Sequence, residues 1–413
     1  MTVSTPTRPA AGPTGPAAVT APVRRRRPAP SPLRPRAPRL GPADREVLWL
    51  YVLTRIGVWI TAGAVTWLFP PDGEARRPAS PLSAWQRWDW WHYLHIAEDG
   101  YFPAGAGPWT PGWDNREAFF PGFPLVLRAV HAVVPHWAAA GALVSFVAGG
   151  VAVVALARIA RRALPVADAG RRTVLFFLLS PCAVFLAAGY TEALFLALAL
   201  PAWLAAQRGN WAAAGVLTCL ACSVRVTGLF LAAALALHFV LGARERAPWR
   251  SAPWLALPAL APLLYGWYLA ARTGDAMAWK HAQERGWYRD FHTPWEAWSH
   301  TWEAAFGHTQ ATGYALMWQG ELLAMVVGLV LLVVLVIRRR LPEALYLALT
   351  LWALGTSYWY MSVPRSTLLW WPLWIALAEW SLRRPRVLAA YLYVAGPVTT
   401  VVAVTFLTGR WAG

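Results

Sequence analysis

One short stretch of the sequence combines a carboxylate, two histidines and several aromatic rings. Residues 87–99 have the sequence RWDWWHYLHIAED. In a helix, Asp89 and His92 would share one face. The tryptophans are typical of the boundary between lipid and water, so Asp89 is a carboxylate held among aromatic rings and a candidate general base. The alternative is an interfacial helix whose Asp89 simply faces water.

Three more ionisable side chains lie at the edges of apolar runs, where a charge often has a function. Glu192 follows the turn 189–191 and opens an apolar run, although an acid there also suits the helix dipole. Arg225 lies between two apolar runs, and Arg365 lies in a similar place after an aromatic stretch. Two such arginines suit the phosphate of an anionic lipid, or each extends its charge to water.

The segment 272–314 mixes aromatic rings with hydrogen-bonding groups, and it contains Lys280, the only lysine of the chain, and His281. This composition suits contact with a sugar or a lipid headgroup, and it also fits an ordinary solvated loop.

Two patterns are weak indications of a metal site. His92 and His95 have i, i+3 spacing, whereas a zinc helix uses i, i+4. Cys219 and Cys222 have CxxC spacing, but no second pair accompanies them. We therefore expect no metal.

The composition excludes a single water-soluble globule. Hydrophobic residues make up 57% of the 413 residues and charged residues only 14%, whereas a soluble domain carries about 25% charged residues. The net charge of +17 comes from 37 Lys and Arg against 20 Asp and Glu, in short basic clusters between apolar runs. This is the pattern of membrane orientation rather than of nucleic-acid binding. We therefore expect an all-α polytopic membrane protein that binds membrane lipids and no nucleic acid.

Eleven apolar runs approach the length of about 20 residues that a spanning helix needs. They are 47–69, 138–157, 173–188, 191–206, 211–224, 228–243, 252–271, 315–337, 341–361, 367–382 and 387–408. We expect them to form one transmembrane domain over 47–410, preceded by a disordered, basic, proline-rich tail over 1–46.

The basic clusters and the tail then lie on the cytoplasmic side. Two long loops, 70–136 and 272–314, face the opposite, extracytoplasmic side. This topology requires that 119–135 does not cross the membrane, so we expect an amphipathic helix at the outer interface there.

Several short motifs resemble those of PIG-V-type mannosyltransferases, relatives of the enzyme that adds the second mannose to the glycosylphosphatidylinositol precursor. They are Trp88-Asp89 with His92, Ile96-Ala97, Glu98 and Gly100-Tyr101; AFFPGFPL at 118–125; SPCAVF at 180–185 with YTEALF at 190–195; SVRVTGL at 223–229; and, more weakly, Arg365 before an aromatic span.

The resemblance implies a GT-C glycosyltransferase fold with many spans and a catalytic first loop on the outer side. It also implies a polyprenyl-phosphate-linked sugar donor, with mannose as the sugar and no nucleotide sugar. Asp89 is then the base that takes the proton of the acceptor hydroxyl, with inversion at the sugar. The candidates for the donor phosphate are Arg225, Arg365 and Lys280. Those for other substrate contacts are His92, Glu98, Glu192 and His281. This scheme needs no cofactor.

We therefore predict an inverting mannosyltransferase of a bacterial plasma membrane, with its active site outside and a glycan, lipid or protein hydroxyl as acceptor. A lipid or glycolipid transporter is the alternative from another class. Transporters commonly show repeated halves and polar groups at mid-membrane, whereas here no internal repeat is evident and the polar groups gather on one face. A purely structural membrane protein is a third alternative, against which the acid and the arginines count mildly.

Overall fold

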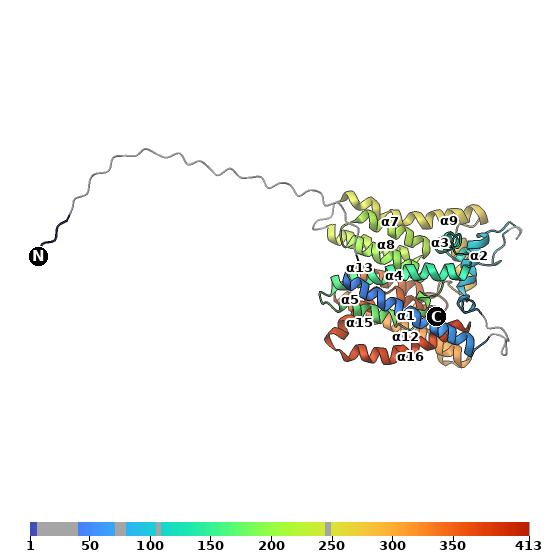
Figure 1. Ribbon diagram of the computed structural model, residues 1–413. Helices are drawn as coiled ribbons and strands as arrows, with labels where there is room; N and C mark the ends of the chain where they lie inside the picture. The colour runs from blue at the N-terminus through green and yellow to red at the C-terminus, as the bar shows by residue number, and fades with distance from the viewer. Residues whose placement is uncertain (6–39, 71–79, 105–108, 244–248, 413) are drawn as a thin grey trace. The chain divides into compact units, whose positions relative to one another are not determined.

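Helices account for the regular secondary structure of the computed structural model, which describes residues 1–5, 40–70, 80–104, 109–243 and 249–412. No strand occurs in these ranges. Most of the predicted tail, residues 6–39, lies outside the described residues, as do parts of the first loop at 71–79 and 105–108 (Figure 1). The prediction of an all-α protein is confirmed for the part of the chain that is described.

Five helical segments are long and apolar enough to cross a membrane. They are α1 (Pro42–Leu68), α4 (Trp137–Ala163), the segment Trp249–Thr273 that ends in α9 (Leu260–Thr273), α12 (Thr312–Ile337) and α16 (Arg386–Leu407). Shorter apolar helices are α6 (Thr191–Ala206), α7 (Trp211–Val224), α8 (Thr227–Ala243) and α13 (Leu341–Gly355). The apolar runs thus correspond to helices, while the count of eleven crossings stays a prediction.

Three predicted spans differ from the helices that the structure shows. The run 173–188 is helical only within α5 (Ala169–Leu178) and again in the 3-10 turn Ala183–Leu186. Pro181 lies in the gap; it has no backbone N–H to donate and disfavours the helical conformation of the residue before it. In the run 341–361 the helix stops at Gly355. In the run 367–382 the helix α15 (Trp371–Arg383) begins only at Trp371.

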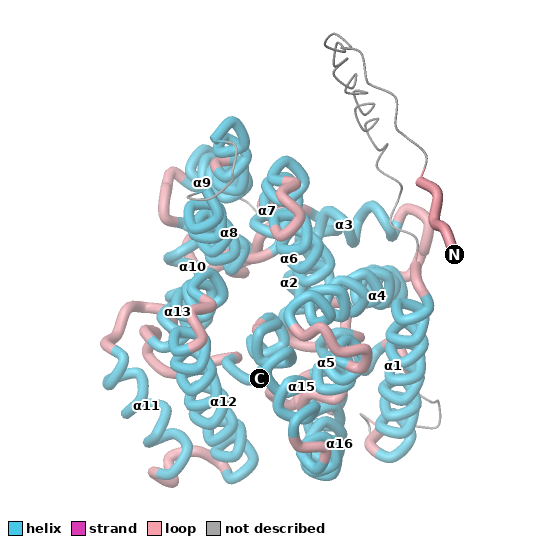
Figure 2. The backbone as a smooth tube through the Cα atoms, turned by 90° about the vertical axis from the view of Figure 1, so that its left-hand side faces the viewer, coloured by secondary structure: helices cyan, strands magenta, loops and turns pink. Residues whose placement is uncertain are grey.

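Small side chains let α4 pack closely on its neighbours. Its contacts with α6 are the most extensive in the chain, and it also packs on α1 and α5. A Cβ atom at Gly149 would lie 2.3 Å from the hydroxyl oxygen of Tyr51 on α1, and that hydroxyl donates a hydrogen bond to the carbonyl of Phe146. Close approach at small residues is the common way for apolar helices to associate. Figure 2 shows α4 beside α1 and α5.

The first loop folds into short helices that pack against the ends of the long ones. α2 (Asp89–Asp99) contacts α3 (Gly122–His131), and α3 in turn contacts α4 and α7. α2 and α3 gather at one end of the helices, near the end of α9 (Figure 1). α3 falls within the expected amphipathic segment: Phe123 and Leu127 are buried, whereas Leu125 and Arg128 are exposed.

The second loop contributes α10 (Ala278–Trp287) and α11 (Pro294–Phe306). α10 packs on α9 and on the 3-10 turn Arg116–Ala118 of the first loop. The two predicted loops therefore lie against each other, and together they form one side of the cavity described next.

Candidate active site

Asp89 is the first residue of α2, and the backbone before it is held from two sides. Trp88 adopts a φ of 48°, a conformation that residues other than glycine rarely take. Its indole N–H donates a hydrogen bond to the carbonyl of Arg410 near the C-terminus, and the Tyr190 hydroxyl donates one to the carbonyl of Arg87. These contacts set the direction in which the Asp89 side chain leaves the backbone.

Trp90, the residue after Asp89, is 1% exposed and packs against two glycines. If Gly141 on α4 carried a Cβ atom, that atom would lie 2.5 Å from the ring of Trp90. A Cβ atom on Gly189, just before α6, would lie 2.4 Å from the same ring. Both distances are shorter than a non-bonded contact allows. Trp90 therefore anchors the start of α2 only because both neighbours lack a side chain.

We expect Gly189→Ala to push Trp90 and the start of α2 out of place. Overpacking of this kind costs about 1–3 kcal/mol, and it should lower both the melting temperature and the turnover proposed below. Gly63→Ala on α1 is the matched control, because a Cβ there meets nothing within 4 Å. Equal melting temperatures and activities for the two variants would contradict this account of the Trp90 contact.

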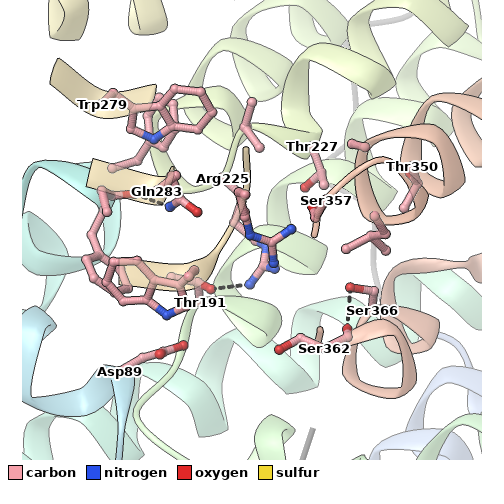
Figure 3. Close-up of a pocket in the computed structure, with 18 of the residues that line it drawn as sticks. Asp89, Thr191, Arg225, Thr227, Trp279, Gln283, Thr350, Ser357, Ser362 and Ser366 are labelled. Carbon is pink, nitrogen blue, oxygen red and sulfur yellow. Dashed lines mark hydrogen bonds between the residues drawn. The ribbon is translucent and has the colours of Figure 1, made fainter. Parts of the chain in front are cut away.

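Four charged side chains form a continuous chain of ion pairs. Arg365 donates from Nη1 to Oδ2 of Asp89 over 2.7 Å and from Nε to Oε1 of Glu192 over 2.6 Å. Arg225 donates from Nη1 to the same Glu192 oxygen over 2.7 Å and to the Thr191 hydroxyl over 2.6 Å. The structure thus brings together residues that are far apart in the sequence (Figure 3 labels Asp89, Thr191 and Arg225).

The two central members of the ion-pair chain, Glu192 and Arg365, are almost inaccessible to solvent. Glu192 is 0% exposed and Arg365 is 7% exposed. The Arg365 guanidinium also lies over two aromatic rings, 4.8 Å from the centroid of Phe185 and 4.7 Å from that of Tyr190. A charge buried in this way requires partners, because removing it from water is costly. Asp89 and Arg225 remain about one-fifth exposed, at 20% and 22% of their side chains.

Glu321 holds the turn that carries Arg365. It is 1% exposed and comes from the middle of α12. Its two carboxylate oxygens accept the backbone N–H groups of Ser362 and Val363 over 2.8 and 2.7 Å. Ser362 needs this support because it adopts a φ of 65°. The sequence analysis missed Glu321, although an isolated acid inside a strongly apolar run is a recognisable signal.

Three members of the ion-pair chain, Asp89, Arg225 and Arg365, line a cavity of about 440 Å³, whereas the buried Glu192 does not. Polar side chains on its lining are Asp89, Thr191, Arg225, Thr227, Lys280, Gln283, Arg289, Thr350, Thr356, Ser357, Ser362, Arg365 and Ser366. Aromatic side chains on it are Tyr93, Phe119, Phe120, Phe230, Trp279, Trp287 and Phe291. Polar groups with flat rings suit a sugar, which offers hydroxyls at its edge and C–H groups on its face.

None of the four predicted substrate contacts lines this cavity, and Glu192 is joined to it only through Arg225 and Arg365. His92 stacks on Phe119 with 4.6 Å between ring centroids, and burial lowers the pKa of its imidazole below the usual value, against the opposing effect of Asp89. Glu98 is exposed on α2. His281 pairs through Nδ1 with Asp275 over 2.7 Å. Lys280 does line the cavity, but its ammonium is paired with Glu284 over 2.8 Å.

The second loop supplies lining residues that were not among the predicted site residues. Gln283 is fixed by a hydrogen bond from Nε2 to the carbonyl of Ala118, 2.8 Å long. Trp279 and Trp287 come from the same helix, α10, and Arg289 follows it. The composition of 272–314 indicated sugar or headgroup contact, but composition does not tell which side chains point inward.

No cluster of three or more His, Cys, Asp or Glu is placed to hold a metal ion among the described residues. The arrangement that is present offers a carboxylate beside several guanidiniums. Oδ1 of Asp89 receives no hydrogen bond from any residue that the structure describes. Such a site can take a proton from an alcohol while the cations stabilise a departing anion.

The chain is similar to several known proteins. It is 32% identical to GPI alpha-1,6-mannosyltransferase 2 of Mus musculus over 214 residues, which are 46% of this chain and 41% of the mouse protein. It is 33% identical to the protein of that name from Rattus norvegicus over 215 residues, with 46% and 42% covered. For the Homo sapiens protein the identity is 34% over 158 residues, with 36% and 30% covered. The chain thus spans about two-fifths of the length of the rodent proteins.

The sequence model of one family covers the part of the chain that carries three of the four members of the ion-pair chain. Asp89, Glu192 and Arg225 lie inside the matched region, whereas Arg289 and Arg365 lie beyond it. The apolar helices and this match together indicate an integral membrane protein. Residues 78–243 match the mannosyltransferase (PIG-V) family.

Proposed function

We propose that this protein is a membrane mannosyltransferase that moves mannose from a polyprenyl-phosphate donor to a hydroxyl group of an acceptor on the extracytoplasmic face. The observation that supports the proposal most directly is the convergence of Asp89, Arg225 and Arg365 at one cavity, where the buried Glu192 joins the two arginines. The similarity to the mannosyltransferase (PIG-V) family indicates the reaction class. The acceptor hydroxyl belongs to a glycan, a lipid or a protein.

Asp89 is the proposed general base. Arg365 holds one of its oxygens, Oδ2, so the other is available to the acceptor hydroxyl. As Asp89 takes the hydroxyl proton, the acceptor oxygen attacks the anomeric carbon of mannose and the bond from that carbon to the phosphate oxygen breaks. One displacement of this kind inverts the configuration at the anomeric carbon.

The leaving group is a lipid phosphate, which departs already ionised. It needs positive charge nearby more than it needs a proton donor. Arg225 is the proposed contact, because it lines the cavity and Glu192 and Thr191 fix one of its nitrogens. Arg365 adds charge while it orients Asp89, and Lys280 can contribute if it leaves Glu284. Substrate contact by His92, Glu98, Glu192 or His281 would require them to move, because none of them lines the cavity.

The reaction can be tested in vesicles reconstituted with the full-length protein. Polyprenyl-phosphomannose with a labelled sugar is supplied together with envelope glycans and glycolipids as acceptors. We expect labelled mannose to pass to the acceptor fraction, with one polyprenyl phosphate released per sugar. Donor restricted to one leaflet then reports which face carries the site. Movement of intact donor across the bilayer without transfer would show the transporter alternative instead.

A further inference from the structure

The positive charges at the cavity are not equally partnered. Arg365 and Arg225 are paired with Asp89 and Glu192, and Lys280 is paired with Glu284. Arg289 also lines the cavity. Within the described residues its guanidinium meets no carboxylate, and its only hydrogen bond is a long one, 3.5 Å from Nη2 to the carbonyl of Met361.

No carboxylate among the described residues forms a direct ion pair with Arg289, and Glu321 and Asp89 act on its charge only from a distance. Glu321, the other buried acid of this region, uses both oxygens on the N–H groups of Ser362 and Val363. Burial and the neighbouring Arg225 guanidinium lower the pKa of Arg289. Like charges that are partly withdrawn from solvent repel each other, and an anion that contacts both guanidiniums would offset this cost.

The segment that carries Arg289 is held in place by backbone hydrogen bonds. The N–H of Tyr358 donates to the carbonyl of Tyr288 over 3.1 Å, and the N–H of His292 donates to that of Thr356 over 2.9 Å. These two bonds flank Arg289 and tie its backbone to the segment 356–358, where Thr356 and Ser357 line the same cavity. The guanidinium is therefore presented by a fixed turn.

We propose that Arg289, together with Arg225, binds the phosphate of the polyprenyl ligand, and that this phosphate is the missing partner of the Arg289 charge. The inference rests on the proposed function for the identity of the ligand. A guanidinium offers phosphate two parallel N–H donors, which an ammonium cannot do.

The donor and the released product differ in the negative charge that they bring to Arg289. The donor is a phosphodiester with one negative charge, whereas the released polyprenyl phosphate is a monoester with about −1.5 to −2 at pH 7. A site with a surplus cation should therefore hold the product more tightly than the donor, and polyprenyl phosphate should inhibit transfer by competing with the donor.

Binding can be measured without turnover, on the full-length protein in lipid nanodiscs, with a short-chain polyprenyl phosphate as the probe. We expect Arg289→Ala and Arg289→Gln to weaken its binding at least about tenfold and Arg289→Lys to restore only part of it. Arg272→Ala is the control with unchanged binding, because Arg272 is exposed and lies outside the cavity lining. Melting temperatures show which variants are folded.

Wild-type affinity in a folded Arg289→Gln protein would overturn the inference, and so would a wild-type protein that does not bind polyprenyl phosphate. Displacement of the probe by inorganic phosphate at equal concentration would also overturn it, because the ligand would then be free phosphate. Binding that depends on Arg289 in a protein that transfers no mannose would instead refute the proposed function and leave the phosphate site standing.

Discussion

Asp89→Asn is expected to lower the rate of mannose transfer by about 10²- to 10⁴-fold, the usual contribution of general acid–base catalysis. An asparagine side chain has nearly the shape of aspartate, and its carbonyl oxygen can still accept the hydrogen bond from Arg365 that Oδ2 accepts now. It cannot take a proton. The acceptor alcohol would have to attack without a base, so the turnover number should fall while the KM for the donor changes little.

The measurement uses membranes that contain the variant and are supplied with polyprenyl-phosphomannose. Asp99→Asn is the matched control, because Asp99 ends the same helix and is exposed; its transfer should equal that of the wild type. Near-normal transfer by Asp89→Asn would remove Asp89 from the role of base. A rise in donor KM alone would point to a binding role instead.

The sequence predicts the helices well, but it does not predict where they stop. An apolar run about as long as a bilayer is thick is helical almost wherever it occurs, because the backbone must satisfy its own hydrogen bonds. An average over a run hides single breaks such as Pro181, and it hides the turn before α15 that presents Arg365 to the interior.

The site could be predicted in part because its residues are unusual where they stand. Asp89, Glu192 and Arg225 are charges at the borders of apolar runs, and they also fall in motifs with a family resemblance. Arg289 could not be found in this way, since it lies in a mixed polar and aromatic segment where an arginine is ordinary. Its lack of a partner is visible only when the neighbours are placed.

The pairing itself is also beyond what one sequence tells. Arg365 forms hydrogen bonds with Glu192 and Asp89, which precede it by 173 and 276 positions in the sequence. No local spacing encodes such contacts; they follow from the packing of α6, the turn before α15 and the first loop around one interior point. Because Glu192 is buried, the contribution of this packing can be measured as the stability lost when Glu192 is replaced.

Glu192→Ala is expected to destabilise the fold by about 3–5 kcal/mol, the usual cost of breaking a buried ion pair. Glu192 is 0% exposed and accepts hydrogen bonds from both Arg225 and Arg365. Its removal leaves Arg365 with Asp89 alone and Arg225 with no carboxylate among the described residues. Arg365 is only 7% exposed and packs over the rings of Phe185 and Tyr190, so solvent relieves little of this cost.

Glu379→Ala is the control that shows whether the loss of stability depends on the burial of the ion pairs or only on their number. Glu379 on α15 also pairs with two arginines, Arg338 and Arg383, but these are 43% and 69% exposed. Exposed pairs contribute about 0–1 kcal/mol, so this variant should melt close to the wild type. Thermal melting of the two proteins in the same detergent makes the comparison. Equal melting temperatures would mean that the fold does not depend on the buried pairs, and that Glu192 serves the substrate rather than the packing.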